Sequence, residues 1–211
     1  MAPPDPYRRI AGYYDRLVEP MQAGVRKVAL EVLPPRPGWH VLDVGCGTGT
    51  GLLPYLEAGC HVTGADVSAA MLEQASARLG ERAKLYLTTS GEPLPEENNR
   101  FDLTLTTLVI HEVPVEARTD FLLEMARVTK PEGRMLLTDF RFGSLRGWRG
   151  PALRTATAVI ERLSGHYSGY RSFKAGGGVP AAVDAAGLVV EREKIVAGGN
   201  MALYVVDPRL A

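Results

Sequence analysis

The sequence lacks several features that mark special classes of protein. Cysteine is rare: Cys46 and Cys60 are the two in 211 residues, and their spacing is not CxxC, so we expect reduced structural thiols rather than a disulfide or a metal site. The four histidines also lack metal-ligand spacing. No apolar run approaches the roughly 18 residues that span a bilayer, and MAPPDPYRRIAGYYD lacks the apolar core of a secretion signal. We therefore expect a cytoplasmic protein without a metal centre.

Net charge is also absent. The formal charge of zero argues against broad nucleic-acid binding. The charge is unevenly distributed, because residues 141–174 carry many basic side chains and a single acid, Glu161. This local excess favours an anionic substrate or an anionic surface, whereas a solvated helix face explains it equally well. Trp148 lies among the arginines of RFGSLRGWRGPALR, which leaves peripheral contact with a membrane interface as an alternative.

Strand and helix signals alternate along most of the chain. Segments of strand composition occupy residues 40–44, 61–66, 84–89, 101–110, 134–140, 188–196 and 201–207. Segments of helical pattern occupy residues 7–32, 50–58, 69–79 and 115–129, and Ser68 is the expected N-cap of the third. The alternation predicts parallel βαβ units, and the short AGGN between the last two strand segments predicts an antiparallel hairpin.

The stretch VLDVGCGTGTG, residues 41–51, carries the most specific signal. A strand leads into three alternating glycines, which are Gly45, Gly47 and Gly49. Glycine turns the backbone through positive φ and lets backbone amides approach a ligand closely. The run does not complete G-x-G-x-x-G in either frame, because Thr50 and Leu52 stand at the final positions, and no Gly-Lys-Ser/Thr is present. We therefore expect a cofactor that contains adenosine but is neither a dinucleotide nor the nucleotide of a phosphate-binding loop.

DVGCGTG resembles the signature of class I S-adenosylmethionine-dependent methyltransferases, in the branch that includes quinone-, sterol- and phospholipid-methylating enzymes. The similarity continues through GADVSAAML, FDLTLTTLVIHEV and EMARVTKPEGRMLLTDF, so it covers most of the chain. Four ordered motifs are far more specific than one glycine turn. The resemblance implies S-adenosyl-L-methionine as the cofactor. It also implies SN2 transfer of the methyl group to a small-molecule acceptor, either aromatic or lipid-like.

The expected fold is a single α/β domain over residues 1–211. We expect a Rossmann-like, mostly parallel sheet of seven strands, with helices on both faces and a C-terminal antiparallel β-hairpin. Residues 1–36 would form an N-terminal helical cap. Residues 141–187 would form a helical lid inserted between strands five and six, with a helix near 151–163, the aromatic HYSGYRSF and the flexible AGGG. Such an insertion at the carboxyl edge of the sheet is well placed to cover a ligand.

The resemblance and the side-chain chemistry together assign the cofactor contacts. The residues expected around the cofactor are Asp43, Gly45, Gly47, Gly49, Asp66, Val67, Met71, Ser90, Gly91, Thr107 and Leu108. Asp66 ends the second strand, where an acid can accept both ribose hydroxyls. By resemblance, Asp43 holds the loop or the cofactor's amino group, Val67 and Met71 pack on the adenine, and Thr107 and Leu108 line the methionyl chain.

The adenine site departs from the family pattern. In similar enzymes an acid precedes the Leu-Pro that follows the third strand, and it accepts from the adenine amino group. Alignment on Leu94-Pro95 places Ser90 at that position, followed by Gly91 and Glu92. We therefore expect Ser90 or a nearby amide to recognise adenine, and Glu92 is equally well explained as a surface residue.

Three residues are candidates for catalysis. His111, in IHEV, is the leading candidate for a general base, because histidine titrates near neutrality; the alternative is a histidine packed at a strand end. Tyr14, in AGYYD, resembles an N-terminal aromatic that closes over the cofactor, or it packs within a helix. Arg141 would hold a carboxylate or phosphate of the substrate, or pair with Asp139.

Two tyrosines of the expected lid, Tyr167 and Tyr170, are candidates for substrate binding. Their rings would shape an apolar pocket or surround a cationic amine, although ordinary packing explains them as well.

Two other functions compete with this hypothesis. One is a phospholipid headgroup N-methyltransferase at a membrane surface, and the other is a non-catalytic subunit that binds S-adenosylmethionine. We expect a monomer or a homodimer and no nucleic-acid partner.

Overall fold

Seven strands form one mixed sheet in the order β3-β2-β1-β4-β5-β7-β6. The computed structural model describes residues 5, 7–8, 11–147, 149–164 and 167–210, and gives only the backbone of residues 11–21, 149, 160–161 and 163–164. The strands are β1 (His40–Val44), β2 (His61–Asp66), β3 (Ala83–Leu87), β4 (Phe101–Thr107), β5 (Thr129–Phe140), β6 (Val189–Val196) and β7 (Met201–Asp207). The first five are parallel, and β7 pairs antiparallel with both β5 and β6. This confirms the predicted sheet and its C-terminal hairpin.

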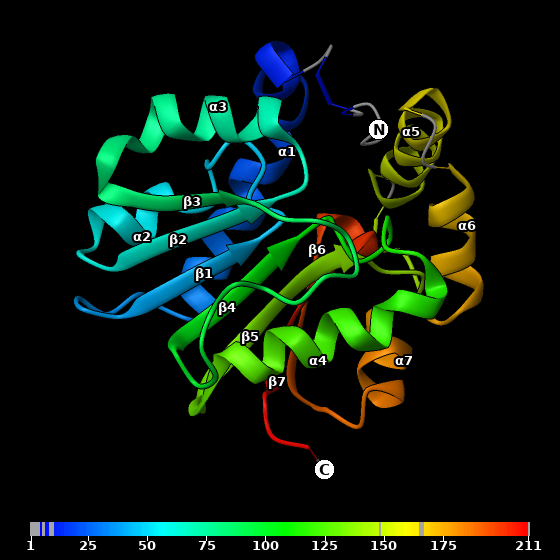
Figure 1. The fold of residues 1–211 in the computed structure, drawn as a ribbon. Coiled ribbons are helices and arrows are strands. Elements are labelled where there is room, and N and C mark those ends of the chain that lie inside the picture. The colour runs from blue at the N-terminus through cyan, green and yellow to red at the C-terminus, as the bar shows by residue number, and fades with distance from the viewer. Residues whose placement is uncertain (1–4, 6, 9–10, 148, 165–166, 211) are drawn as a thin grey trace.

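Helices cover both faces of the sheet. They are α1 (Ala11–Val32), α2 (Leu53–Glu57), α3 (Ala69–Leu79), α4 (Arg118–Val128), α5 (Arg149–Ser164), α6 (Tyr167–Ala175) and α7 (Gly178–Ala185). Figure 1 shows α4 and α7 in front of the strands and α1 behind them. The carboxyl ends of β4 and β5 point toward the side on which α5 and α6 lie (Figure 1). A ligand site of an open parallel sheet is expected at these carboxyl ends.

The core lies between the central strands and the helices. Leu42 of β1, Phe101 and Leu103 of β4, Met135 of β5 and Leu203 of β7 are completely buried. Strands buried on both faces need continuous apolar runs, which explains why VLDV and MLL of the sequence lack polar alternation.

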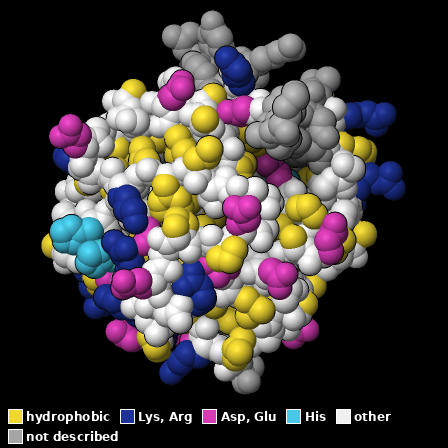
Figure 2. Space-filling model, in the orientation of Figure 1, with side chains coloured by type: hydrophobic (Ala, Val, Ile, Leu, Met, Phe, Trp, Pro, Cys, Tyr) yellow, Lys and Arg dark blue, Asp and Glu magenta, His cyan; other side chains and the backbone are white. Residues whose placement is uncertain are grey.

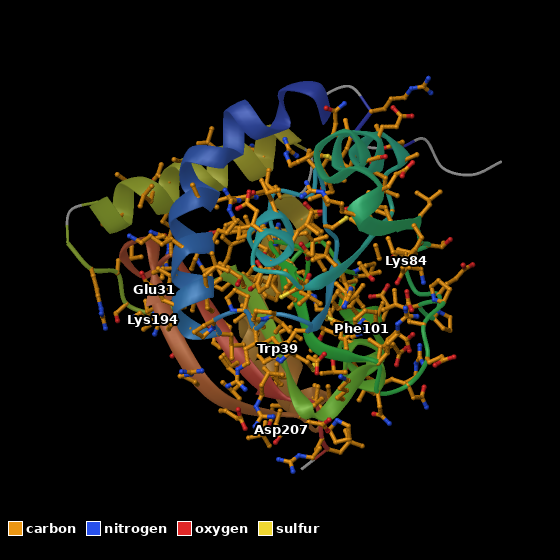
Figure 3. The ribbon with its side chains drawn as sticks, turned by 90° about the vertical axis from the view of Figure 1, so that its left-hand side faces the viewer. Glu31, Trp39, Lys84, Phe101, Lys194 and Asp207 are labelled. Atoms are coloured by element: carbon orange, nitrogen blue, oxygen red, sulfur yellow. The ribbon has the colours of Figure 1, made fainter. Side chains whose placement is uncertain are left out.

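The C-terminal end of α1 closes the fold beside β6. Figure 3 shows Glu31 of α1 and Lys194 of β6 close together at this place. The guanidinium of Arg192, also on β6, donates a hydrogen bond of 3.0 Å to the backbone carbonyl of Val32. The first helix and the last hairpin are therefore fastened to one another.

Ser68 caps α3 as predicted. Its hydroxyl oxygen accepts a hydrogen bond from the Met71 amide at 3.1 Å. The same hydroxyl donates to the carboxylate of Asp5 at 2.8 Å, and Asp5 also accepts from the Ala70 amide at 3.1 Å. The amino end of α3 thus has two cap residues, one from its own chain segment and one from the N-terminus.

Several element boundaries differ from the prediction. The fourth strand ends at Thr107 instead of continuing to residue 110, because Leu108 turns the backbone to a φ of +59°. The helix expected at 50–58 is confined to α2. The fifth strand begins earlier, at Thr129. The aromatic HYSGYRSF lies largely in α6, and its AGGG continuation turns at Gly177, with a φ of +84°, directly into α7.

The burial of β1 leads to a stability prediction. We expect Leu42→Ala to lower the free energy of unfolding by about 2–5 kcal/mol, because a completely buried side chain leaves a cavity. Leu87→Ala is the matched control: Leu87 lies on edge strand β3 and is 58% exposed, so its loss should cost less than about 1 kcal/mol. Urea denaturation measures both values. Equal losses would contradict the assignment of β1 to the centre of the core.

Candidate functional site

Two cavities lie at the carboxyl ends of the parallel strands, one on each side of the glycine turn. The larger, of about 420 Å³, extends from the turn to α4. The smaller, of about 80 Å³, lies between the turn and α1. Gly45, Gly47 and Thr107 line both cavities. The turn therefore stands at their junction, where an elongated ligand would contact it along its length.

The three alternating glycines have different structural roles. All three have positive φ, which favours glycine at each position. A Cβ at Gly45 would overlap the side chain of Val109, and a Cβ at Gly49 would meet Leu79 of α3 at 2.9 Å. A Cβ at Gly47 would instead enter open space beside the cavities. Gly47 is thus the position that keeps room for a ligand, whereas Gly49 permits close packing against α3.

Asp66 holds the turn from the end of β2. Its Oδ2 accepts from the Gly47 amide at 2.8 Å, and its Oδ1 accepts from the Ser68 amide at 2.9 Å. Burial raises the pKa of Asp66, while these backbone hydrogen bonds act in the opposite direction. Each carboxylate oxygen can accept more than one hydrogen bond. Asp66 can therefore receive ligand hydroxyls at the large cavity, which it lines beside Val67 and Met71.

Asp43 is buried under the turn and lines the small cavity. Its Oδ1 has no hydrogen-bond partner among the described residues. Burial and the nearby charge of Asp66 raise the pKa of Asp43 to about 8. A buried acceptor without a partner is costly unless a ligand supplies a donor. The orphaned oxygen therefore fits a ligand that carries an ammonium or another donor into this cavity.

The chain directly after β4 forms part of the wall of the large cavity, and it contains the two residues expected there. Thr107 and Leu108 line the large cavity, and so do Ser90 and Gly91 from the loop after β3. The left-handed φ of Leu108 is uncommon for a residue with a Cβ, and such conformations cluster at binding sites.

His111 lies behind this wall in a buried pair with Asp139. Its Nδ1 lies 2.8 Å from Asp139 Oδ1, and its backbone amide donates to Asp139 Oδ2 at 3.1 Å. Its ring packs on Phe140 at a centroid distance of 4.6 Å. The second ring nitrogen, Nε2, lies 3.9 Å from Oε1 of Glu112, which lines the large cavity. Asp139 thus fixes the imidazole through Nδ1, and His111 itself is not among the described residues that line either cavity.

Arg141 does not pair with Asp139, so that alternative is wrong. Its Nε donates to Glu193 of β6 at 3.0 Å. Asp139 instead pairs with His111 Nδ1 and accepts from the backbone amides of His111 and Phe140. Arg154, one turn into α5, donates to the Arg141 carbonyl at 2.8 Å. The side chains of Arg141 and Arg154, two cations of the basic segment, therefore form contacts within the fold.

The tyrosines of the expected lid lie in α6. Tyr170 is buried and meets Phe140 and Phe142 edge-on, each at a centroid distance of 5.3 Å. Tyr167 stacks on Tyr170 at 6.3 Å, and the guanidinium of Arg162 lies over its ring. Neither tyrosine is among the described residues that line the two cavities. Trp148 lies outside the described residues, and so does the side chain of Tyr14.

Sequence reasoning missed a pair of hydrogen-bonded residues in the lining of the large cavity. The Tyr7 hydroxyl donates to the Glu112 carboxylate, with distances of 2.7 and 2.9 Å to its two oxygens. Both residues line the cavity. Their separation of 105 positions leaves no local pattern. The one signal in the sequence that could have indicated Glu112 is its place next to His111 in IHEV.

Sequence reasoning also missed the contribution of α4 and of α1. Ala117, at the start of α4, and then Asp120, Phe121, Glu124 and Met125 form one wall of the large cavity. Gln22, Val25, Arg26 and Ala29 of α1 line the small one. No Lys, Arg or His is among the described residues that line the large cavity, and acidic side chains stand among apolar ones across this face (Figure 2). Its electrostatics favour a ligand with donors or positive charge.

Known proteins similar to this chain share its central region. Residues 42–137 match the methyltransferase domain family. Demethylmenaquinone methyltransferase of Renibacterium salmoninarum is 31% identical over 69% of this chain and 61% of its own length. Malonyl-[acyl-carrier protein] O-methyltransferase of Pectobacterium atrosepticum is 36% identical over 66% of this chain and 53% of its own length. The chain thus spans between about half and three-fifths of these relatives.

Solved structures resemble nearly the whole chain. A chain of the Haloferax volcanii complex that contains the Trm112 methyltransferase activator has a TM-score of 0.75 and 17% identity, over 98% of this chain and 99% of its own. The DhpI–SAH complex has a TM-score of 0.66 and 18% identity, over 97% of this chain and 93% of its own. Identities this low show a shared fold.

The contrast between two glycines of the turn is testable. We expect Gly45→Ala to lower the free energy of unfolding by about 1–3 kcal/mol more than Gly47→Ala, because only the Cβ at Gly45 overlaps Val109. Both variants share the strain of an L-residue at positive φ. Urea denaturation of both proteins measures the difference. Adding Val109→Ala to Gly45→Ala should recover part of the loss; no recovery would show that the overlap is not its cause.

Proposed function

We propose that this chain, whose residues 42–137 match a methyltransferase domain family, transfers the methyl group of S-adenosylmethionine to a small-molecule acceptor. One observation carries the proposal: the glycine turn has a carboxylate on each side, Asp66 at the large cavity and the orphaned Asp43 at the small one. S-adenosylmethionine carries hydroxyl donors on its ribose and an ammonium on its methionyl end. The two acids match these groups.

The proposed contacts divide the cofactor between the two cavities. Asp66 would accept the ribose hydroxyls, and Val67 and Met71 would contact the adenine. Val67 is 47% exposed and lines the large cavity, so its side chain is accessible to a ring that binds there. Asp43 would accept from the ammonium, and Gly47 would admit the methionyl chain. The remaining proposed contacts are Gly45, Ser90, Gly91, Thr107 and Leu108.

The cofactor supplies a methyl group already activated on a sulfonium, so the chain mainly has to hold and orient the acceptor. An acceptor that carries a proton at working pH must also lose it. We propose that His111 accepts this proton at Nε2, while Asp139 fixes the ring through Nδ1. Glu112, 3.9 Å from Nε2, connects this pair to the cavity. Arg141 would have to exchange its partner Glu193, 3.0 Å away, to bind an anionic group of the acceptor.

The proposed acceptor is aromatic or lipid-like. Two of the relatives named above are a demethylmenaquinone methyltransferase and a malonyl-[acyl-carrier protein] O-methyltransferase, and a solved structure with a similar fold is a geranyl diphosphate methyltransferase. Tyr167 and Tyr170 stay proposed acceptor contacts on their side-chain chemistry alone, because neither lines the two cavities and Tyr170 also packs on Phe140 and Phe142. Tyr14 keeps its proposed place over the cofactor on resemblance alone.

The proposed partners and location follow from a few observations. None of the described helices is long and apolar enough to cross a membrane. Peripheral contact with a membrane is less favoured than the composition suggests, because Arg141 and Arg154 are used within the fold. We propose a cytoplasmic monomer or homodimer; both cysteines are buried and unpaired, as a reducing compartment allows.

Binding of S-adenosylhomocysteine tests the function directly. Isothermal titration calorimetry should show binding to the wild-type chain, and Asp66→Asn should weaken it by tenfold or more, because the charged acceptor of two hydroxyls is lost. Binding at pH 7 should also release up to about one proton, since Asp43 has a pKa of about 8 in the free protein and an ammonium partner would lower that pKa. The release appears as a dependence of the heat on the ionisation enthalpy of the buffer.

The controls separate these effects. Asp43→Asn should abolish the proton release, which should also vanish above about pH 9, where Asp43 is already ionised in the free protein. Asp184→Asn changes an exposed acid of α7 and should alter neither quantity. Failure of both S-adenosylmethionine and S-adenosylhomocysteine to bind would rule out the methyltransferase function.

The role of His111 has its own test. With a demethylated naphthoquinol as acceptor, His111→Gln should lower kcat by about 10²–10⁴, as loss of a general base does, with little change in S-adenosylhomocysteine affinity. Asp139→Asn should shift the pH–rate profile, because the imidazolium loses its carboxylate partner. An unchanged kcat in His111→Gln would identify this histidine as a packing residue.

A further inference from the structure

We propose that the carboxylate of Asp120, on α4, accepts the hydrogen bond from the adenine amino group of the cofactor. This inference rests on the proposed function and concerns the one part of the cofactor site at which the sequence departs from similar enzymes. There, an acid precedes the Leu-Pro of the loop after the third strand, whereas this chain has Ser90. Ser90 is neutral, so the acids that could accept from the amino group must be sought among the other residues that line the cavity.

The loop and α4 are fastened together at Leu94. Its amide donates to Glu124 Oε1 at 2.6 Å, and its carbonyl accepts from the Arg127 guanidinium at 3.2 Å. Arg127 also donates to Glu124 Oε2 at 2.8 Å, and this bond lowers the pKa of Glu124. The peptide of Leu94 is thus held from both sides by α4. Helix α4 therefore forms a fixed wall opposite the loop in the large cavity.

Most carboxylates of the cavity already have partners. Asp66 accepts from two backbone amides, Glu112 accepts from Tyr7, and Glu124 accepts from Leu94 and Arg127. Asp120 and Glu92 are the cavity acids for which no hydrogen bond to the described residues is formed. The acceptor for a further ligand donor is therefore one of these two.

Position favours Asp120 over Glu92. Asp120 lies in the first turn of α4, one turn before Glu124, so the clamp at Leu94 fixes its backbone. Its short side chain has little freedom to lose on binding. Phe121 and Met125, on the same helix, supply apolar surface to the cavity beside it. Glu92 lies on the loop, with a longer and more mobile side chain. Helix α4 thus offers both an acceptor and an apolar wall for an aromatic base.

The adenine amino group gives this assignment a sharp test. Hypoxanthine carries a carbonyl oxygen where adenine carries the amino group, so a carboxylate that accepts from adenine would repel hypoxanthine. We expect the wild-type chain to bind S-adenosylhomocysteine more tightly than S-inosylhomocysteine, by about tenfold, in isothermal titration calorimetry. Asp120→Asn should reduce this ratio by three- to tenfold, because an amide can donate to the carbonyl oxygen.

Two matched variants serve as controls. Glu92→Gln neutralises the other acid of the cavity that has no partner among the described residues, and Asp184→Asn neutralises an exposed acid of α7 outside the cavity lining. Both should leave the ratio of the two affinities unchanged. Loss of discrimination in either variant, with Asp120→Asn unchanged, would overturn the proposal, and so would a wild-type chain that binds both compounds equally. Failure to bind either compound would overturn the proposed function itself, so the two failures are distinguishable.

Discussion

The hydrogen bonds of Asp66 join three parts of the site. The carboxylate ends β2, accepts from the glycine turn after β1 at Gly47, and accepts from the amino end of α3 at Ser68. Because β1 and β2 are parallel neighbours in register, their carboxyl ends meet at one place, and a single acid can hold both following loops. The two cavities exist on either side of the turn because this contact fixes the turn's path.

Two buried carboxylates determine which ligand charge the glycine turn favours. Two carboxylates, Asp43 and Asp66, are buried near each other, and their repulsion together with burial raises the pKa of Asp43 to about 8. Such an arrangement disfavours the fully ionised state in the free protein. A cationic ligand relieves both the repulsion and the missing hydrogen bond of Asp43. The preference for a ligand with positive charge is thus a property of the fold.

The segment between β5 and β6 shows that composition alone leaves the use of a side chain open. Its arginines suggested an anion site and its tyrosines suggested a substrate wall. In the structure, Arg141 and Arg154 bind Glu193 and backbone carbonyls, while Tyr170 joins the aromatic packing around Phe140. Long cationic side chains and tyrosines combine apolar and polar parts, so they serve packing as readily as binding. Charge counts along a sequence cannot distinguish these uses.

The sequence by itself determined the order of strands and helices, the hairpin, the glycine turn with Asp66, and the cap at Ser68. These features depend on periodicity and on residues near each other in the chain, which is why they are readable. The pairings of Tyr7 with Glu112, of Leu94 with Glu124 and of His111 with Asp139 were decided by the tertiary structure. Each joins residues between 28 and 105 positions apart, so no local pattern in the sequence records the contact.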